Sequence, residues 1–231
     1  MSIKSVIFSN IKKMIFFMWL FSTVFTSCKK ESDDVLLLDR ITFDTPSGII
    51  KYKFEYDSHG RLTLFNFQIN ASQYFAMTSI GYHESGEISN LNGRKVERTG
   101  DVITVSSGNT SAYTYSLSSD QLEITTHSTG ATSTFRYDGN GNITEIFYSS
   151  LSYHLYCEKY DGKKSPFYSC ATPAWVFAEL FPGYGFGTVN NPCSLTGDDT
   201  SISYTYEYNS AGYPTKRKSK GEIVDYTYRK K

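Results

Sequence analysis

Two stretches of the chain carry acidic and amide side chains at spacings that a metal or catalytic site could use. Residues 138–142 run Asp-Gly-Asn-Gly-Asn, which is the opening of a calcium-binding loop. Ile143 stands where that loop needs glycine, however, and Ser149 stands where it needs a bidentate glutamate. The neighbouring Asp198 and Asp199 lie in a Gly-Asp-Asp-Thr segment, which is more typical of a turn than of a glycosidase carboxylate pair. We therefore expect neither stretch to bind a metal or to catalyse a reaction.

Histidine and serine do not form a catalytic pattern either. The four histidines are scattered along the chain, at His59, His83, His127 and His154. No serine lies in a nucleophile elbow with a histidine and an acid in a suitable order. The sequence therefore predicts that the protein is not an enzyme, has no catalytic residues and needs no cofactor.

An aromatic insertion near residues 172–183 is the best candidate for binding a ligand. Thr172 is a suitable N-cap, Pro173 suits the first helical position and Pro182-Gly183 would stop the segment, so we expect a helix at 173–181. Aromatic faces stack on sugar rings and anchor protein interfaces. The candidate ligand-binding residues are Trp175, Phe177, Phe181, Tyr184 and Phe186. The alternative is that these rings belong to the core.

The elements that would position these residues follow from a repeated pattern. Tyr is followed by Asp, Asn or His, two free residues, Gly, one free residue, then Leu, Ile or Pro and Thr or Ser. Copies lie at 54–63, 135–144 and 206–215, and a fourth lies at 81–89. Aromatic residues that alternate with polar ones indicate strands, and the Asp or Asn with a later Gly is typical of a turn. Each copy therefore predicts a β-hairpin.

Short connections between the predicted strands imply that neighbours pair in sequence order. The 19 tyrosines and 16 phenylalanines suit half-buried strands. The predicted fold class is all-β: an up-and-down antiparallel meander of many short hairpins, barrel-like or two-layered, with one short helix. Residues 36–231 would form a single antiparallel β domain with the helical insertion near 172–183. Most strands look too short and too charged on their outer face for a membrane-spanning barrel.

The first residues have the layout of a secretory signal. Residues 1–27 combine three lysines with an apolar run at 14–21 that is too short to span a membrane. With Cys28 after it, this segment resembles a bacterial lipoprotein signal peptide. The resemblance implies that Cys28 is lipidated and that residues 28–35 form a flexible tether. The alternative is an ordinary signal peptide that is cut near Ser27.

The charge balance argues against nucleic acid as a partner. The chain has 23 basic and 23 acidic residues, and removal of residues 1–27 would take away three lysines and no acidic residue, which leaves a net charge of about −3. Basic residues gather at 216–231. We expect them to lie on a solvated last hairpin, where lysines protect an edge strand.

Three cysteines follow Cys28, namely Cys157, Cys170 and Cys193. An oxidising compartment would allow one pair to close and would leave one thiol over. Cys170 and Cys193 bracket the insertion and are the pair that we expect, with the other two pairings left open. The sequence has no C-x-x-C motif and no histidine spacing that would indicate zinc.

Longer motifs resemble two groups of proteins. Tyr-Asp-x-x-Gly-Arg-Leu at 56–62 resembles the YD repeats of Rhs-type surface proteins, which build β-hairpins. Three elements that follow in order, at 160–167, 190–192 and 204–216, resemble a family of uncharacterised Bacteroidetes outer-membrane lipoproteins with a porin-like β fold. The acidic residues after Cys28 resemble the surface-export signal of such lipoproteins. These resemblances imply a fold and a location but no activity and no site residues.

We therefore predict a lipid-anchored cell-envelope protein that acts as a non-catalytic binding module for a glycan or protein at the outer surface. Its partners would be the lipid bilayer, through acylated Cys28, and that ligand. The predicted location is the outer membrane facing the cell surface, with the periplasmic face as the alternative. A structural or assembly component of an envelope complex is the alternative function.

Overall fold

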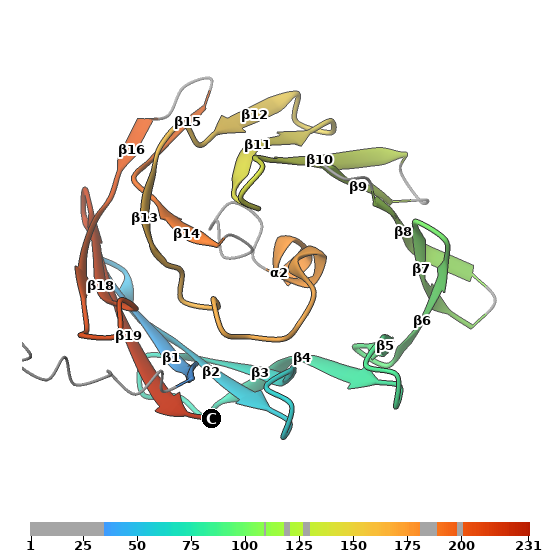
Figure 1. Ribbon diagram of the computed structural model, residues 1–231, viewed down its shortest axis with the longest axis horizontal. Helices are drawn as coiled ribbons and strands as arrows, with labels where there is room; N and C mark the ends of the chain where they lie inside the picture. Colours follow the sequence, from blue (N-terminus) through green and yellow to red (C-terminus); the bar gives the residue numbers. More distant parts are fainter. Residues whose placement is uncertain (1–34, 109, 118–120, 127–129, 181–188, 198–200) are drawn as a thin grey trace, which may run out of the picture. The chain divides into compact units, whose positions relative to one another are not determined.

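The computed structural model shows a long antiparallel meander of strands (Figure 1). The structure describes residues 35–108, 110–117, 121–126, 130–180, 189–197 and 201–231. Val35–Lys231 forms a compact unit of its own. Within the described ranges, no helix combines the length and the apolar character that crossing a membrane requires.

The first half of the chain contains β1 (Leu36–Thr45), β2 (Gly48–Tyr56), β3 (Leu62–Ile69), β4 (Phe75–Tyr82), β5 (Ile88–Leu91), β6 (Arg94–Thr99), β7 (Val102–Ser107) and β8 (Thr110–Leu117). Next come β9 (Gln121–Thr126), β10 (Ala131–Tyr137), β11 (Ile143–Tyr148), β12 (Tyr153–Tyr156) and β13 (Tyr160–Lys164). The last part contains α2 (Ala174–Leu180), β14 (Asn190–Pro192), β15 (Ser194–Gly197), β16 (Ser201–Ser203), β17 (Thr205–Tyr208), β18 (Pro214–Ser219) and β19 (Glu222–Lys230).

Strand pairing follows the sequence almost throughout. Each strand from β1 to β12 pairs antiparallel with the next, β12 pairs with β15, and β15 pairs with β16. After β17, which pairs with β18, the last strand β19 returns to pair with β1. These pairings join the strands into one 17-stranded sheet, with β13 and β14 as a separate pair, and the large sheet is a curled meander and not a closed barrel. The predicted all-β antiparallel meander is confirmed.

The last hairpin is not an edge. Lys216 of β18 lies opposite Asp225 of β19, and Val224 of β19 lies opposite Phe43 of β1, so β19 has a partner on both sides. Arg217 is only 3% exposed, although Lys218 beside it is exposed. The expectation that the basic residues protect a solvated edge strand is therefore wrong, because β19 pairs with both β18 and β1.

The repeated hairpin turns share one geometry. Gly60, Gly141 and Gly212 have φ of 81°, 85° and 80°, which lies in the left-handed region that glycine enters without strain. The amide of each glycine donates to the carbonyl of the Asp or Asn three residues earlier, at 3.0 to 3.1 Å. The β2–β3 pair, like the other copies, shifts register at the tyrosine that precedes the turn. The hairpins predicted from the repeat are confirmed.

The structure contains the helix that the sequence predicts for the insertion, α2. It also contains three strands on either side of the insertion that the sequence does not predict, namely β13, β14 and β15. β13 and β14 pair as a separate two-stranded ribbon, and β15 follows directly. Figure 1 shows this ribbon and α2 surrounded by the strands of the meander. Phe167, Trp175, Val176 and Phe177 belong to the same buried cluster as the strand residues. The described part of the insertion therefore packs into the interior of the meander.

Candidate functional site

The described rings of the predicted binding group are part of the core. Trp175 is 7% exposed and Phe177 is 3% exposed. The ring of Trp175 lies 4.9 Å from that of Tyr115, and Phe177 lies 4.4 Å from Phe167, which packs edge-on against Phe54. Both rings are therefore largely covered by other side chains. The other three candidates, Phe181, Tyr184 and Phe186, lie outside the described residues, as does Cys28.

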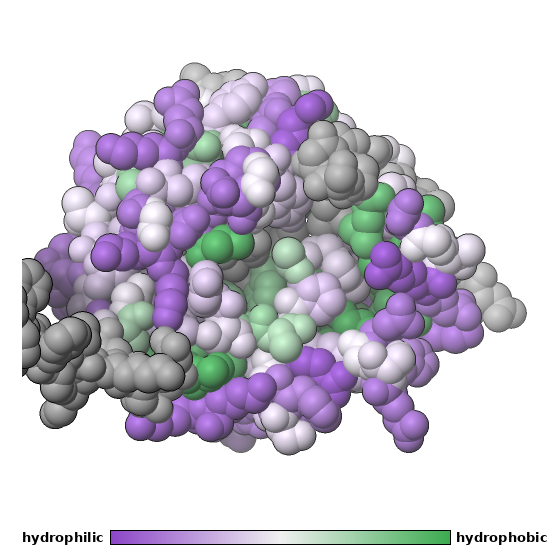
Figure 2. Space-filling view, in the orientation of Figure 1, coloured by the Kyte–Doolittle hydropathy of each residue, from purple (hydrophilic) through white to green (hydrophobic). Residues whose placement is uncertain are grey.

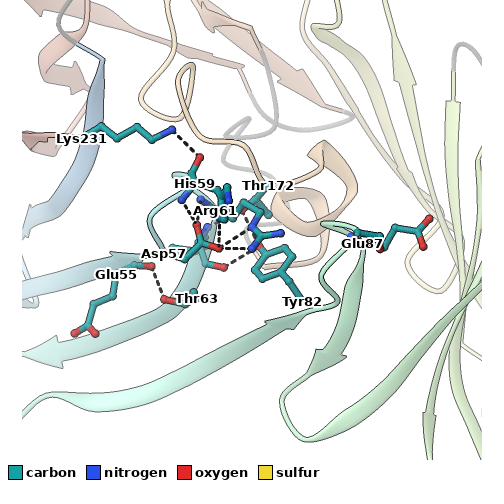
Figure 3. A network of polar contacts seen from close by, with 11 residues as sticks. Glu55, Asp57, His59, Arg61, Thr63, Tyr82, Glu87, Thr172 and Lys231 are labelled. Atoms are coloured by element: carbon teal, nitrogen blue, oxygen red, sulfur yellow. Dashed lines mark hydrogen bonds and ion pairs between the residues drawn. The ribbon is translucent and has the colours of Figure 1, made fainter.

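Polar contacts hold the start of the insertion against the first hairpin turn (Figure 3). The hydroxyl of Thr172 accepts a hydrogen bond from the Leu62 amide at 2.8 Å and lies 3.0 Å from the hydroxyl of Tyr82. The amide of Ala171 donates to the carbonyl of Gly60 at 3.0 Å. Burial, as the largest cause, raises the pKa of Tyr82 to about 12, so this phenol stays neutral. Thr172 therefore joins the insertion to the sheet.

An ion pair between Arg61 and Asp57 stabilises the same turn. Arg61 donates to the carboxylate of Asp57 at 2.6 Å, and its guanidinium lies 4.4 Å from the centre of the Tyr82 ring. The oxygen Oδ1 of Asp57 also accepts from the amides of His59 and Arg61. Burial would raise the pKa of Asp57, but these hydrogen bonds outweigh it and lower the pKa below its ordinary value. Each of these groups already has a structural role.

The residues that resembled a calcium loop serve the second turn in the same way. Oδ1 of Asp138 accepts from the amides of Asn140 and Asn142 at 2.8 and 2.9 Å. Among the described residues, no group of three or more metal-ligating side chains comes together. The pair Asp198 and Asp199 lies outside the described ranges.

The described histidines lie apart from one another. His59 lies in the first turn, with its side chain 73% exposed, and His83 begins the turn after β4. His154 on β12 lies 2.9 Å from Glu145 and stacks between Phe147 and Tyr156. These positions bring no two histidines together.

A cavity of about 780 Å³ lies in a different part of the molecule, between β12, β15, β16 and the β18–β19 hairpin. This volume falls within the range of small-molecule sites, which is about 300–1,000 Å³. The lining combines two aromatic rings, three aliphatic side chains, three serines and three charged residues: Tyr153, Leu155, Leu195, Ser201, Ile202, Ser203, Tyr204, Arg217, Ser219, Lys220 and Glu222. Over the whole face of the molecule that Figure 2 shows, hydrophilic residues cover most of the outer edge, and hydrophobic residues gather toward the centre.

Arg217 is the buried charge in this lining. Its Nη2 donates to Oε1 of Glu222 at 2.5 Å, and its guanidinium carbon lies 4.7 Å from the centre of the Tyr204 ring. Its Nε is buried and has no hydrogen-bond partner. Burial would lower the pKa of Arg217, but Tyr226, Tyr206 and Glu222 raise it overall. The cavity wall thus holds a charged guanidinium, whose Nε is itself closed to solvent.

The cavity residues were not predicted as a site. Arg217 was placed with the solvated basic residues, and the register shows why that placement fails: it lies opposite Tyr206 on β17 and Val224 on β19. Its position on the inner face becomes visible only when both neighbours of β18 are known. Leu195 and Ile202 lie opposite each other on β15 and β16, which are strands of only four and three residues, and so short a strand as β15 gives little sequence pattern.

The three cysteines in the described part of the chain are free thiols. The expected Cys170–Cys193 disulfide is therefore not formed. Cys170 packs against the hydrophobic core, whereas Cys193 follows β14, and its amide donates to the carbonyl of Lys159. Burial raises the pKa of Cys170, so this thiol is poorly ionised.

The three motifs that resemble the lipoprotein family meet in space. Tyr160 lies opposite Pro192, and the side chain of Asn191 donates to the carbonyl of Lys164 at 2.9 Å. The hydroxyl of Tyr208 bonds the carboxylate of Asp161, and that of Tyr206 donates to the carbonyl of Pro192 at 2.9 Å. These motifs hold the β13–β14 ribbon to β17, so their common role is structural.

Comparison with solved structures shows what the fold is similar to. The chain is similar to a porin-like protein from Bacteroides uniformis, with a TM-score of 0.51 and 14% identity over 83% of this chain and 98% of that one. A porin-like protein from Bacteroides vulgatus aligns with a TM-score of 0.37 and 11% identity, over 84% and 98% of the two chains. No protein-family model and no curated protein matches the chain. The first similarity confirms the porin-like β fold that the sequence resemblance implied.

Proposed function

We propose that the protein is a lipid-anchored component of the cell envelope that binds a glycan in the cavity beside β16 and β18. It acts as a binding module at the outer surface and catalyses no reaction. The lipid anchor would be acylated Cys28, and the porin-like relatives support an envelope location.

The observation that carries the proposal is the composition of the cavity wall. The rings of Tyr153 and Tyr204 offer aromatic faces, and Ser201, Ser203 and Ser219 offer hydroxyl groups that can donate and accept. A sugar presents both apolar C–H faces and many hydroxyls, so it matches this mixture. A purely apolar ligand would leave the serines unpaired, which costs free energy.

The shape of the site favours a small ligand over a protein. A stable protein interface covers about 800 Å² per partner and is usually broad. A concave site of about 780 Å³ instead encloses a few sugar rings. The two described candidates of the insertion, Trp175 and Phe177, are buried, which supports a ligand in the cavity over a protein docked on those rings.

A glycan panel tests the proposal. The protein should show a rise in melting temperature with at least one oligosaccharide, because a ligand that binds only the folded state stabilises it. Ile202→Trp, which fills the cavity, should remove that rise, and Tyr204→Ala should weaken it. Tyr156→Ala is the matched control, because Tyr156 is 40% exposed and does not line the cavity. If no oligosaccharide raises the melting temperature, the glycan proposal fails.

Fractionation tests the proposed address separately. Cys28→Ala should leave the protein unprocessed or released from membranes, because the lipid supplies the anchorage. If the variant still fractionates with the outer membrane, the lipid anchor is wrong, whatever the cavity binds.

A further inference from the structure

The cavity wall contains a charged donor that the fold does not use fully. Arg217 is 3% exposed, and its one protein acceptor in the described part of the chain is Glu222, at Nη2. A guanidinium has five N–H donors. The Nε N–H is itself buried and makes no hydrogen bond, and one N–H of Nη2 bonds Glu222, so the remaining Nη N–H groups are the donors that a ligand in the cavity would meet.

The net charge of the lining also favours a ligand that can accept hydrogen bonds from Arg217, and in particular an anion. The charged lining residues are Arg217, Lys220 and Glu222, which together carry one excess positive charge. Lys220 is exposed at the β18–β19 turn, so it lies where an entering ligand would meet it, while Arg217 lies in the wall. A site with this arrangement attracts an anion and disfavours a cation.

We infer that the glycan bound in this cavity is acidic, and that a singly charged group on one sugar ring, the carboxylate of a uronic acid or a sulfate ester, accepts hydrogen bonds from Arg217. This inference rests on the proposed function and names the substrate class of that site. One negative charge on the sugar balances the one excess positive charge of the lining. The planar guanidinium matches the paired oxygens of either group, which a lysine in the same place would not.

Tyr204 and Glu222 would position the recognising group. The guanidinium of Arg217 lies over the Tyr204 ring, and Glu222 binds one end of it at Nη2. Two contacts on a single planar group limit its rotation, so its remaining donors keep a constant direction. A preorganised charge loses less side-chain entropy when the ligand binds.

Calorimetric titration of three probes into the intact protein tests the inference. The probes are a trimer of galacturonic acid, the methyl ester of the same trimer, and a trimer of a sulfated neutral sugar. The acidic trimer should bind at least tenfold more tightly than its ester, and its affinity should fall as salt is raised. Preference for the sulfated trimer over the uronate would keep the inference and identify the anion as a sulfate ester.

Variants separate recognition from folding. Arg217→Lys keeps the charge but loses the fork, and it should reduce the affinity for the acidic trimer about tenfold with the ester unchanged. Lys220→Gln, at an exposed position, should reduce it about threefold. Lys218→Gln is the control, because Lys218 is exposed, pairs with Glu207 and does not line the cavity. Should Arg217→Lys fail to fold, Lys220→Gln and the salt series still decide.

The two proposals fail in different ways. Equal binding of the acidic trimer and its ester would overturn the acidic-glycan inference and leave glycan binding in place. If neither these trimers nor any member of the neutral panel binds, both proposals fall.

Discussion

The insertion and the cavity use similar aromatic residues for opposite purposes. In the insertion, Trp175 packs against Tyr115 of β8 and Phe177 packs against Phe167, and Val176 between them is fully buried. In the cavity, Tyr204 lies under a guanidinium and beside serines that can make hydrogen bonds. Aromatic content alone therefore does not mark a binding site. The polar groups beside the rings distinguish a cavity that can bind a ligand from a packed core.

The largest expected effect is a loss of stability when a buried ring of the insertion is removed. Phe177→Ala removes a ring that packs against Phe167, and we expect a loss of about 3–5 kcal/mol in unfolding free energy, because the vacated space cannot collapse fully. Urea denaturation measures the loss. Tyr153→Ala is the comparison from the cavity wall, where the ring borders open space. A smaller loss for Phe177→Ala than for Tyr153→Ala would reverse the assignment of the two regions.

The second prediction concerns the charge in the cavity wall. Glu222→Ala leaves Arg217 buried without its acceptor, and we expect a loss of about 2–3 kcal/mol. Glu207→Ala is the matched control, because Glu207 and Lys218 form an exposed pair whose removal should cost less than about 1 kcal/mol. Equal stability of the two variants in urea would mean that the Arg217–Glu222 pair is not a buried one in solution.

The third prediction tests how the insertion is attached. Thr172→Val keeps the shape of the side chain and removes the acceptor of the Leu62 amide, so we expect a loss of about 1–2 kcal/mol. Thr215→Val, at an exposed hydroxyl that bonds the Glu207 carbonyl, should change stability by less than about 0.5 kcal/mol. If the two substitutions have the same effect on thermal unfolding, Thr172 does not hold the insertion.

The fourth prediction isolates the backbone of the repeated turn. A side chain at Gly212 would meet no atom within 4 Å, so Gly212→Val should cost about 1 kcal/mol through its positive φ alone. Gly139 follows Asp138 in the second turn and has no positive φ, and a side chain there also meets open space, so Gly139→Val is the control. A neutral Gly212→Val in the same denaturation assay would argue against the left-handed turn.

The smallest effect is a pH dependence from the turn carboxylates. Burial would raise the pKa of Asp138, but hydrogen bonds from Asn142, Asn140 and Gly141 lower it overall. The pKa of Asp57 is lowered in the same way, by hydrogen bonds from Arg61 and His59 in its own turn. The stability that these groups contribute is therefore fully present above the unfolded pKa of about 3.9, and it is lost as the pH falls through the lower folded values. Denaturation midpoints at pH 6 and pH 3 measure the loss. Asp138→Asn should reduce it, since Asn209 fills the same role in the third turn.

The hairpins could be predicted because their signal is local. Asp57 and Gly60 lie within one turn, and their hydrogen bonds depend only on nearby residues. The helix was equally accessible, since Pro173 and Pro182 enclose it in the sequence, and the structure has it at Ala174–Leu180.

The cavity could not be predicted because its wall is assembled from distant strands. Tyr153 and Arg217 come from β12 and β18, and only the pairing of β12 with β15 and the run from β16 into β17 bring those strands near each other. Arginine is usually exposed, so the residue type alone predicts a solvated side chain for Arg217. In the structure Arg217 is buried, and only the strand register reveals this. Nonlocal pairing, and not residue type, determines this site.

The most direct test of the account is calorimetric titration of one glycan into three forms of the protein. The glycan is the best binder from the panel, and the forms are the unmodified protein, Ile202→Trp and Trp175→Phe. We expect Ile202→Trp to lose at least tenfold in affinity with an unchanged melting temperature, and Trp175→Phe to have a lower melting temperature and an unchanged affinity. Full affinity in Ile202→Trp together with lost affinity in folded Trp175→Phe would place the ligand at the insertion and contradict the account.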